Sequence, residues 1–344
     1  MRPLKIQGHT RPLTQVKYNS DGDLLLTVAR DKVANIWYSH NGERLGTLDG
    51  HEGSIMSIDV DVQTYLVATG SGDGTARLWD IKTGTQLFTW NTLASTRYVA
   101  FSPKGDRLLL VTDENFGCKS KLQIFNLNRE TPTKQSEEPV LVIENQDGPK
   151  AKYMVAAWTS EGENLLVGLN NGEVKKFSLS GEKKGEAVKS IKAHDEAVSD
   201  LQTSLDRSYF ITSSRDKLAK LFDSESLENI HSYEGQAPLN SACITTVKDF
   251  VIVGGGQDAS AVTTTADQEG DFKSKIFHKI FEDHLGDVKG HFGPINTLAA
   301  DPKGRSFTSG GEDGFIRLHH FDPSYFEFYY DIERRNKEEL AAAN

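Results

Sequence analysis

A histidine in this chain is followed four times by an aspartate 22 residues later, and by an aromatic residue or a histidine six residues after that. The sets are His9, Asp31 and Trp37; His51, Asp73 and Trp79; His194, Asp216 and Phe222; and His291, Asp313 and His319. A single active site needs such a set once. A spacing repeated with this fidelity therefore indicates an architectural unit copied along the chain, and the unit is predicted to be a propeller blade.

The residues around each set define the type of blade. A glycine precedes three of the four histidines, Trp79-Asp80 and Phe222-Asp223 end their segments as WD-like pairs, and a hydroxyl residue lies four positions before each aspartate. Those hydroxyl residues are Thr27, Thr69, Thr212 and Ser309. The pattern resembles the WD40 repeat. The resemblance implies a hydrogen-bonded tetrad of His, Ser/Thr, Asp and Trp in each such blade, since buried polar groups are costly unless paired. The alternative, His/Asp acid-base chemistry, is disfavoured by the repetition.

The number of blades follows from the histidine positions. Successive histidines of the sets are 42, 143 and 97 residues apart, so units of about 40 to 50 residues fill these gaps with one, three and two blades. The blade after His291 makes seven. Two blades without a tetrad are still visible as strand-turn-strand segments that begin at Tyr98 and Ala156.

The last blade has three predicted strands within 295–320, and the segment Pro3 to Gln7 has no other partner. We therefore expect the N-terminal strand to close the ring as the outer strand of blade seven, because closure leaves no open end in the ring. The fold class is predicted to be all-β, with a seven-bladed WD40 β-propeller over residues 1–321 and a helical tail over 322–344.

Composition limits the chemistry and the partners. The net charge of -10 opposes non-specific electrostatic binding to the phosphate backbone of nucleic acids, and no direct sequence-specific nucleic-acid contact is expected either. Only Cys118 and Cys243 are present, without a CxxC or HExxH motif, so we expect inert thiols, no metal site and no cofactor. No apolar run reaches the length of a membrane span and no signal-like core is found, so a cytoplasmic location is the expectation.

The tail after the ring carries an amphipathic pattern. Asp322-Pro323 is typical of a helix start, and Tyr325, Phe328, Tyr329 and Ile332 then share one predicted helical face. Two interpretations stay open. The aromatic face packs back on the ring, or part of it meets another protein. Separately, the polar segment 128–139 in blade three is predicted to be a mobile surface loop.

Several strings outside the repeat carry a narrower resemblance. They are Asn41-Gly-Glu-Arg-Leu-Gly-Thr47, Gly254-Gly-Gly-Gln257 with Val262-Thr-Thr-Thr265, Gly290-His-Phe-Gly-Pro-Ile-Asn296, and 310–322. Together they are similar to the WD40 subunit, called subunit i, of eukaryotic translation initiation factor 3, over residues 1 to about 333. The region 113–150 departs from that pattern, which leaves the 128–139 loop without a role to carry over.

The resemblance implies a non-catalytic scaffold. The family's subunit i joins subunits b and g in a module that works with the small ribosomal subunit during initiation and scanning. The family's main contact is a helix from the C-terminal end of subunit b, laid on blades five and six. Exposed groups of those blades are the candidate partner-binding residues of this chain: Asp206, Tyr209, Asp223 and Gln257.

The residues alone leave other functions open. Another WD40 adaptor, of the serine/threonine kinase receptor-associated type or a ubiquitin-ligase substrate receptor, is a rival within the binding class. The strings Gly254-Gly-Gly-Gln257 and Val262-Thr-Thr-Thr265, which fall in the predicted sixth blade, argue against both. A propeller hydrolase or peptidase needs one non-repeated His/Asp or Ser/His/Asp constellation. Each conspicuous His-Asp set in this chain is repeated, so no enzymatic activity is expected.

Overall fold

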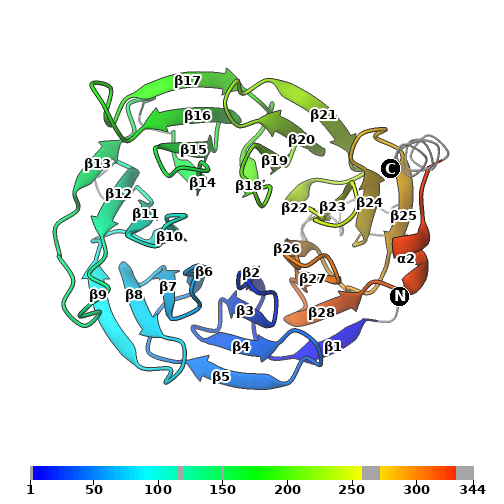
Figure 1. Ribbon diagram of the computed structural model, residues 1–344, viewed down its shortest axis with the longest axis horizontal. Coiled ribbons are helices and arrows are strands. Elements are labelled where there is room, and N and C mark those ends of the chain that lie inside the picture. The colour runs from blue at the N-terminus through cyan, green and yellow to red at the C-terminus, as the bar shows by residue number, and fades with distance from the viewer. Residues whose placement is uncertain (1–2, 115–118, 149–150, 258–271, 331–344) are drawn as a thin grey trace, which may run out of the picture.

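The computed structural model describes residues 3–114, 119–148, 151–257 and 272–330. In these residues 28 strands form seven four-stranded antiparallel sheets, and each sheet is one blade of a ring (Figure 1). The blades follow one another along the chain, and the first strand of each lies nearest the centre. The prediction of an all-β propeller with seven blades is confirmed.

The strands of each blade are as follows. Blade one comprises β2 (Leu13–Tyr18), β3 (Leu24–Ala29), β4 (Ala34–Tyr38) and β5 (Arg44–Leu48), and blade two comprises β6 (Ile55–Val60), β7 (Leu66–Ser71), β8 (Thr75–Asp80) and β9 (Gln86–Asn91). Blade three comprises β10 (Thr96–Phe101), β11 (Arg107–Thr112), β12 (Lys121–Asn126) and β13 (Leu141–Glu144). Blade four comprises β14 (Tyr153–Trp158), β15 (Asn164–Leu169), β16 (Glu173–Ser178) and β17 (Ala187–Lys192). Blades five to seven comprise β18 (Val198–Thr203), β19 (Tyr209–Ser214), β20 (Leu218–Asp223) and β21 (Asn229–Glu234); β22 (Leu239–Ile244), β23 (Phe250–Gly255), β24 (Ser274–His278) and β25 (His284–Val288); and β26 (Ile295–Ala300), β27 (Ser306–Gly311), β28 (Phe315–His320) and β1 (Leu4–Gln7). Blades three and four therefore keep the four-stranded form although they lack a tetrad.

The N-terminal strand closes the ring. β1 pairs antiparallel with β28, with Leu4 opposite Leu318 and Gln7 opposite Phe315. The last blade is thus built from the two ends of the described chain, as the unpaired N-terminal segment predicts. Ile6 points into a buried cluster with Leu318 and Trp37, which joins blade seven to blade one.

The core lies between neighbouring blades. The second strands are buried along their whole length in blades one, two, six and seven, whereas the outer strand β17 is almost entirely exposed. One cluster, for example, joins Val28 and Ile36 of blade one to Ile58, Val67 and Trp79 of blade two. Each blade therefore buries an apolar face against the next, which is the main stabilising term of such a ring.

The two faces of the ring carry different turns. Because the strands of each blade follow in sequence and run antiparallel, the turns between first and second strands and between third and fourth strands share one face. We call this the first face. The turns between second and third strands lie on the opposite face.

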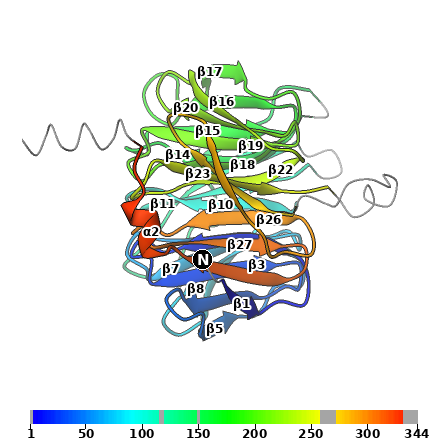
Figure 2. The same cartoon turned by 90° about the vertical axis from the view of Figure 1, so that its right-hand side faces the viewer.

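The tail helix is shorter than predicted. α2 (Pro323–Glu327) has five residues, begins after Asp322 as expected, and lies at one face of the ring (Figure 2). The backbone is extended at Phe328, so the predicted helical face through Phe328 and Tyr329 is wrong, and Ile332 lies outside the described residues. The aromatic side chains still pack on the ring. Tyr325 stacks on Phe321 with ring centroids 3.8 Å apart and meets Phe250 edge-on at 5.4 Å.

The segment 128–139 is attached to the ring. The Arg129 guanidinium pairs with the buried Asp61 carboxylate of blade two and donates to the Gly105 carbonyl at 2.7 Å. The carbonyl of Ser136 accepts a hydrogen bond from the Trp90 indole at 2.9 Å. The Arg129 side chain and the Ser136 carbonyl therefore attach the segment to blades two and three, and the predicted mobility of the segment stays a prediction.

Three further predictions can be compared with the structure only in part. The string Val262-Thr-Thr-Thr265, which contributes to the family resemblance, lies outside the described residues, as does Cys118. Cys243 is free and buried, and burial raises the pKa of its thiol. No described helix is long and apolar enough to cross a membrane.

Candidate partner-binding surface

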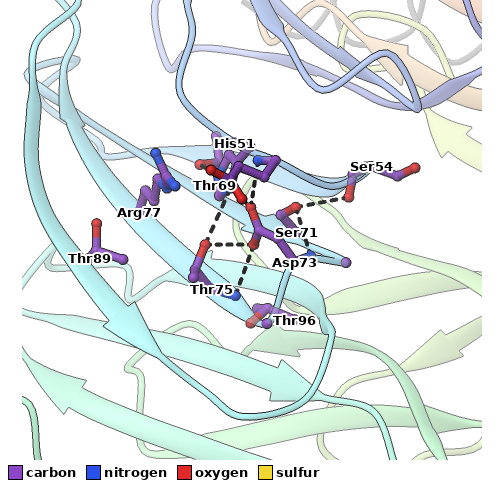
Figure 3. A network of polar contacts seen from close by, with 12 residues as sticks. His51, Ser54, Thr69, Ser71, Asp73, Thr75, Arg77, Thr89 and Thr96 are labelled. Atoms are coloured by element: carbon purple, nitrogen blue, oxygen red, sulfur yellow. Dashed lines mark hydrogen bonds and ion pairs between the residues drawn. The ribbon is translucent and has the colours of Figure 1, made fainter.

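Figure 3 shows three members of the blade-two tetrad, His51, Thr69 and Asp73. His51 Nδ1 donates to the Asp73 carboxylate at 2.8 Å, and the Thr69 hydroxyl donates to His51 Nε2 at 2.7 Å. The Trp79 indole N–H in turn donates to the Thr69 oxygen at 2.8 Å. Since the carboxylate only accepts, the bond to Asp73 places a proton on Nδ1, and Nε2 of the neutral histidine then accepts from the Thr69 hydroxyl.

The other three sets have the same arrangement at their own blades. The His9, His194 and His291 Nδ1 atoms lie 3.0, 2.9 and 3.1 Å from the carboxylates of Asp31, Asp216 and Asp313. Their Nε2 atoms each lie 2.8 Å from a hydroxyl, of Thr27, Thr212 and Ser309 respectively. At the fourth position Trp37 donates to Thr27 at 2.9 Å, and His319 lies 3.4 Å from Ser309. Phe222 has no donor and stacks on Phe210 instead.

Burial and hydrogen bonding assign the charges within the tetrads. Burial lowers the pKa values of His51, His194 and His291. Burial opposes ionisation of Asp73, but hydrogen bonds from Thr75 and His51 hold its pKa below the ordinary value. In these three tetrads, neutral histidine therefore faces ionised aspartate at neutral pH. These groups lie in separate blades with their polar atoms engaged, which is an arrangement suited to structure rather than to proton transfer.

Asp206 lies in the turn between β18 and β19, on the first face of blade five. Its carboxylate accepts from the hydroxyls of Ser204 at 2.6 Å and Ser208 at 2.8 Å, and from the Ser208 backbone N–H at 3.2 Å. The hydrogen bond from Ser204 is the main reason that its pKa lies below the ordinary value. The residue is exposed, so an ionised and oriented carboxylate faces outward from the ring.

Asp223 ends β20 at the same face of the same blade. It lies directly opposite Tyr209 across the β19–β20 ladder. Its Oδ1 accepts the backbone N–H groups of Ser226 at 2.6 Å and Glu225 at 3.0 Å, and the bond from Ser226 leads the causes that lower its pKa. We refer to Asp206, Tyr209 and Asp223 as the blade-five rim.

Tyr209 links the rim to blade six. Lys279, which follows β24, donates to the Tyr209 hydroxyl at 3.2 Å and lies 5.0 Å from the centroid of its ring. The same ammonium pairs with Asp249. Sequence reasoning missed Lys279 and Asp249, because neither occupies a position marked by the WD40 repeat. Their presence makes the surface a mixture of an aromatic ring, a cation and carboxylates.

Gln257 does not belong to this surface. β23 begins at Phe250, which pairs with His278 beside Lys279, and ends at Gly255, which pairs with Leu239. A six-residue strand rises by about 3.3 Å per residue, so its two ends lie at opposite faces of the ring. Gln257 follows the far end. The structure therefore brings together three of the four predicted partner-binding residues and separates the fourth.

The geometry of the described residues defines the class of protein. Among the residues that the structure describes, no group of three or more His, Cys, Asp or Glu side chains is arranged to hold a metal ion. Seven four-stranded blades with a recurring His–Thr/Ser–Asp chain define a β-propeller of the WD40 type.

Comparison with known proteins narrows the class to one family. The EIF3I family model matches residues 1–331. Eukaryotic translation initiation factor 3 subunit I of Scheffersomyces stipitis is 51% identical over 352 residues, covering 99% of each chain. The subunit I of Candida albicans is 50% identical over 348 residues, covering 98% of each chain, and that of Saccharomyces cerevisiae is 47% identical over 350 residues, covering all of both. The chain belongs to the family of subunit I of eukaryotic translation initiation factor 3, and the resemblance drawn from its sequence is confirmed.

Proposed function

We propose that this chain is a non-catalytic scaffold subunit of eukaryotic translation initiation factor 3 in the cytoplasm. In this role it binds the C-terminal helix of subunit b, and also subunit g, and so supports recruitment of the small ribosomal subunit and scanning. The observation that carries the proposal is the match to the subunit I family over almost the whole chain. A match of this extent includes the ring, its closure and both faces.

The blade-five rim supports the proposed contact with subunit b. Asp206 and Asp223 present two carboxylates whose orientation is fixed by hydrogen bonds within their own turns. An ionised carboxylate has about four acceptor positions, so each retains capacity for an external donor. Arg-carboxylate pairs are strong and fix orientation, which suits a helix that carries arginine.

The turn-stabilising role of these carboxylates is compatible with binding. Hydrogen bonds within the turns hold Asp206 and Asp223 in place before a partner arrives, which reduces the entropy lost on association. Tyr209 adds an aromatic surface between them and blade six, and aromatic residues are enriched in the energetically dominant part of interfaces.

The tetrads support the absence of catalysis. Every histidine of a set is engaged through both ring nitrogens, as in His51 with Asp73 and Thr69. The four sets belong to four different blades, so they do not converge on one substrate. The net charge of -10 further argues against direct sequence-specific nucleic-acid binding.

The proposal is tested by purifying the tagged chain from cells at low copy number and identifying its partners by mass spectrometry. We expect the other subunits of the initiation factor, with subunits b and g at stoichiometric levels, and small-subunit ribosomal proteins at lower levels. An untagged strain is the control. Recovery of a cullin or kinase set in place of initiation-factor subunits would contradict the proposal.

A further inference from the structure

The ring encloses a channel with two adjoining cavities. The wider one, of about 640 Å³, opens toward the opposite face, and the narrower one, of about 240 Å³, lies toward the first face. Gln15, Tyr98, Asp200 and Gln202 line both, so the two cavities adjoin at these side chains. Neither the family assignment nor the blade-five rim uses the groups inside it.

Arg207 enters the narrow cavity from an unusual backbone position. It follows Asp206 in the first turn of blade five, with a φ of 60°. The corresponding position of four other blades is glycine with a similar φ: 65° at Gly22, 69° at Gly105, 70° at Gly162 and 67° at Gly304. Residues with a Cβ are disfavoured in this left-handed region. Blade two also has a side chain at this position, Thr64 with a φ of 58°, so blades two and five accept local strain where four blades use glycine. Of these two residues, Arg207 is the one that lines the narrow cavity, which points to a use for its side chain.

The Arg207 guanidinium is incompletely paired inside the channel. It lines the narrow cavity, and its Nη1 is buried without a protein hydrogen-bond acceptor among the described residues. A buried cationic donor is costly without an acceptor. Burial also lowers the pKa of Arg207, which reflects the same loss of hydration. The group is therefore poised to donate to a ligand that carries negative charge.

Lys17 supplies a second cation to the same cavity. Its ammonium lies 3.4 Å from Asp59, so one carboxylate offsets part of its charge. An ammonium has three donors, and this pair uses one of them. Asp59 is itself engaged through its other oxygen, which accepts the Phe101 backbone N–H at 2.8 Å.

Asp200 is the other carboxylate that faces this cavity. It accepts hydrogen bonds from Ser241 Oγ at 2.5 Å, Gln202 Nε2 at 2.8 Å and its neighbour's backbone N–H at 2.8 Å. Its donors come from the protein itself, and burial raises its pKa. The cations Arg207 and Lys17 are consequently the groups with unused donors in the narrow cavity.

We propose that the narrow end of the channel binds a small phosphate-type oxyanion between Arg207 and Lys17. The planar guanidinium fork matches two oxygens of a phosphate group, and the ammonium adds a point charge from the other side. A cavity of about 240 Å³ is below the usual size of a drug-like pocket, so it suits a single phosphate group. Free inorganic phosphate and the phosphomonoester of a small molecule share this chemistry. The site does not depend on the proposed partner binding.

The test is calorimetric titration of the purified full chain with sodium phosphate, and separately with adenosine 5′-monophosphate, at constant ionic strength. Saturable binding with one site per chain is expected for at least one of them. Binding of phosphate alone identifies free phosphate as the ligand class, and binding of both shows that a phosphomonoester enters. Absence of saturable binding by either overturns the proposal.

Variants localise the site. Arg207→Gly should weaken binding about tenfold or more, because it removes a charge-assisted donor pair. Glycine fits the φ of 60°, so this variant should melt at the wild-type temperature or above it. Lys17→Met should weaken binding as well. The matched control is Lys104→Ala, which removes one exposed positive charge from a turn on the same face outside the cavity and should bind as the wild type does. Equal affinity of Arg207→Gly and the control overturns the assignment.

Discussion

Leu4 pairs with Leu318, so the first described strand completes the last blade. This relationship leads to the first prediction. Deleting residues 1–7 removes the ladder to β28 and uncovers the buried cluster around Ile6, which should destabilise the ring by several kcal/mol. The melting temperature of the truncated chain measures the effect. The control is Leu4→Ala, since Leu4 is 38% exposed and its removal should matter little. A truncated chain that melts like the wild type would show that closure is not structural.

The second prediction compares two turns. Asp73→Ala should cost about 2–4 kcal/mol of unfolding free energy, because His51 loses its buried acceptor and the Thr75 and Glu52 backbone N–H groups lose theirs. The matched change in blade four is Asn171→Ala, where the side chain accepts the Glu173 backbone N–H and, among the described residues, no buried histidine depends on it. It should cost clearly less. Urea unfolding of both variants measures the difference, and equal losses would refute the assignment of Asp73 to a stabilising tetrad.

The third prediction concerns pH. The pKa values of His51, His194 and His291 are lowered by burial, so the unfolded chain binds protons that the folded chain excludes. These neutral histidines therefore contribute to the free energy of unfolding above a pH of about 6.5, and the contribution is lost as the pH falls below that value. The pKa values of Asp73 and Asp313 are also lowered, so protonation of these carboxylates reduces the free energy of unfolding further as the pH falls below about 4. Unfolding free energy measured between pH 8 and pH 5 should therefore decrease toward acid. An increase toward acid would contradict the charge assignment.

The fourth prediction tests the attachment of the 128–139 segment. Arg129→Ala should destabilise the chain by about 1–3 kcal/mol, because it leaves the buried Asp61 carboxylate without its cation. The control in the same segment is Lys134→Ala, since Lys134 is exposed. Thermal unfolding compares the two variants with the wild type. If both melt alike, Arg129 does not hold the segment.

The sequence was sufficient to predict the blades that carry a tetrad, because the buried hydrogen bonds of a tetrad require a fixed number of residues between its members. His51, Thr69 and Asp73 meet only when the turns between them keep their lengths, so the spacing repeats and can be read directly. Closure was predictable for a similar reason, since Leu4–Gln7 is apolar at alternate positions and the last blade lacks a strand.

The conformation of the C-terminal tail could not be predicted from the sequence in the same detail. Tyr325 and Phe328 share a helical face in the sequence, but each finds its own contact with the Phe250 ring, at 5.4 and 6.0 Å. Tertiary packing therefore satisfies the apolar side chains without a continued helix, and the periodicity alone could not exclude that outcome.

The sequence predicted which blades carry the candidate partner-binding residues, but it did not predict on which face of the ring each residue lies. Asp206 and Gln257 belong to adjacent blades, yet one is in a turn on the first face and the other follows a strand that ends at the opposite face. Lys279 was missed because contacts between blades at the rim leave no periodic signal.

The most direct test of the scaffold account is the affinity of the full chain for the subunit b C-terminal helix, measured by titration calorimetry. We predict that Asp206→Lys with Asp223→Lys abolishes binding while circular dichroism and melting stay close to the wild type, because two rim charges are reversed and the core is untouched. The matched control is Asp21→Lys with Asp80→Lys, which makes the same charge change at the equivalent positions of blades one and two and should bind normally. Wild-type affinity of the Asp206/Asp223 variant, or equal loss in the control, would contradict the assignment of the blade-five rim as the partner surface.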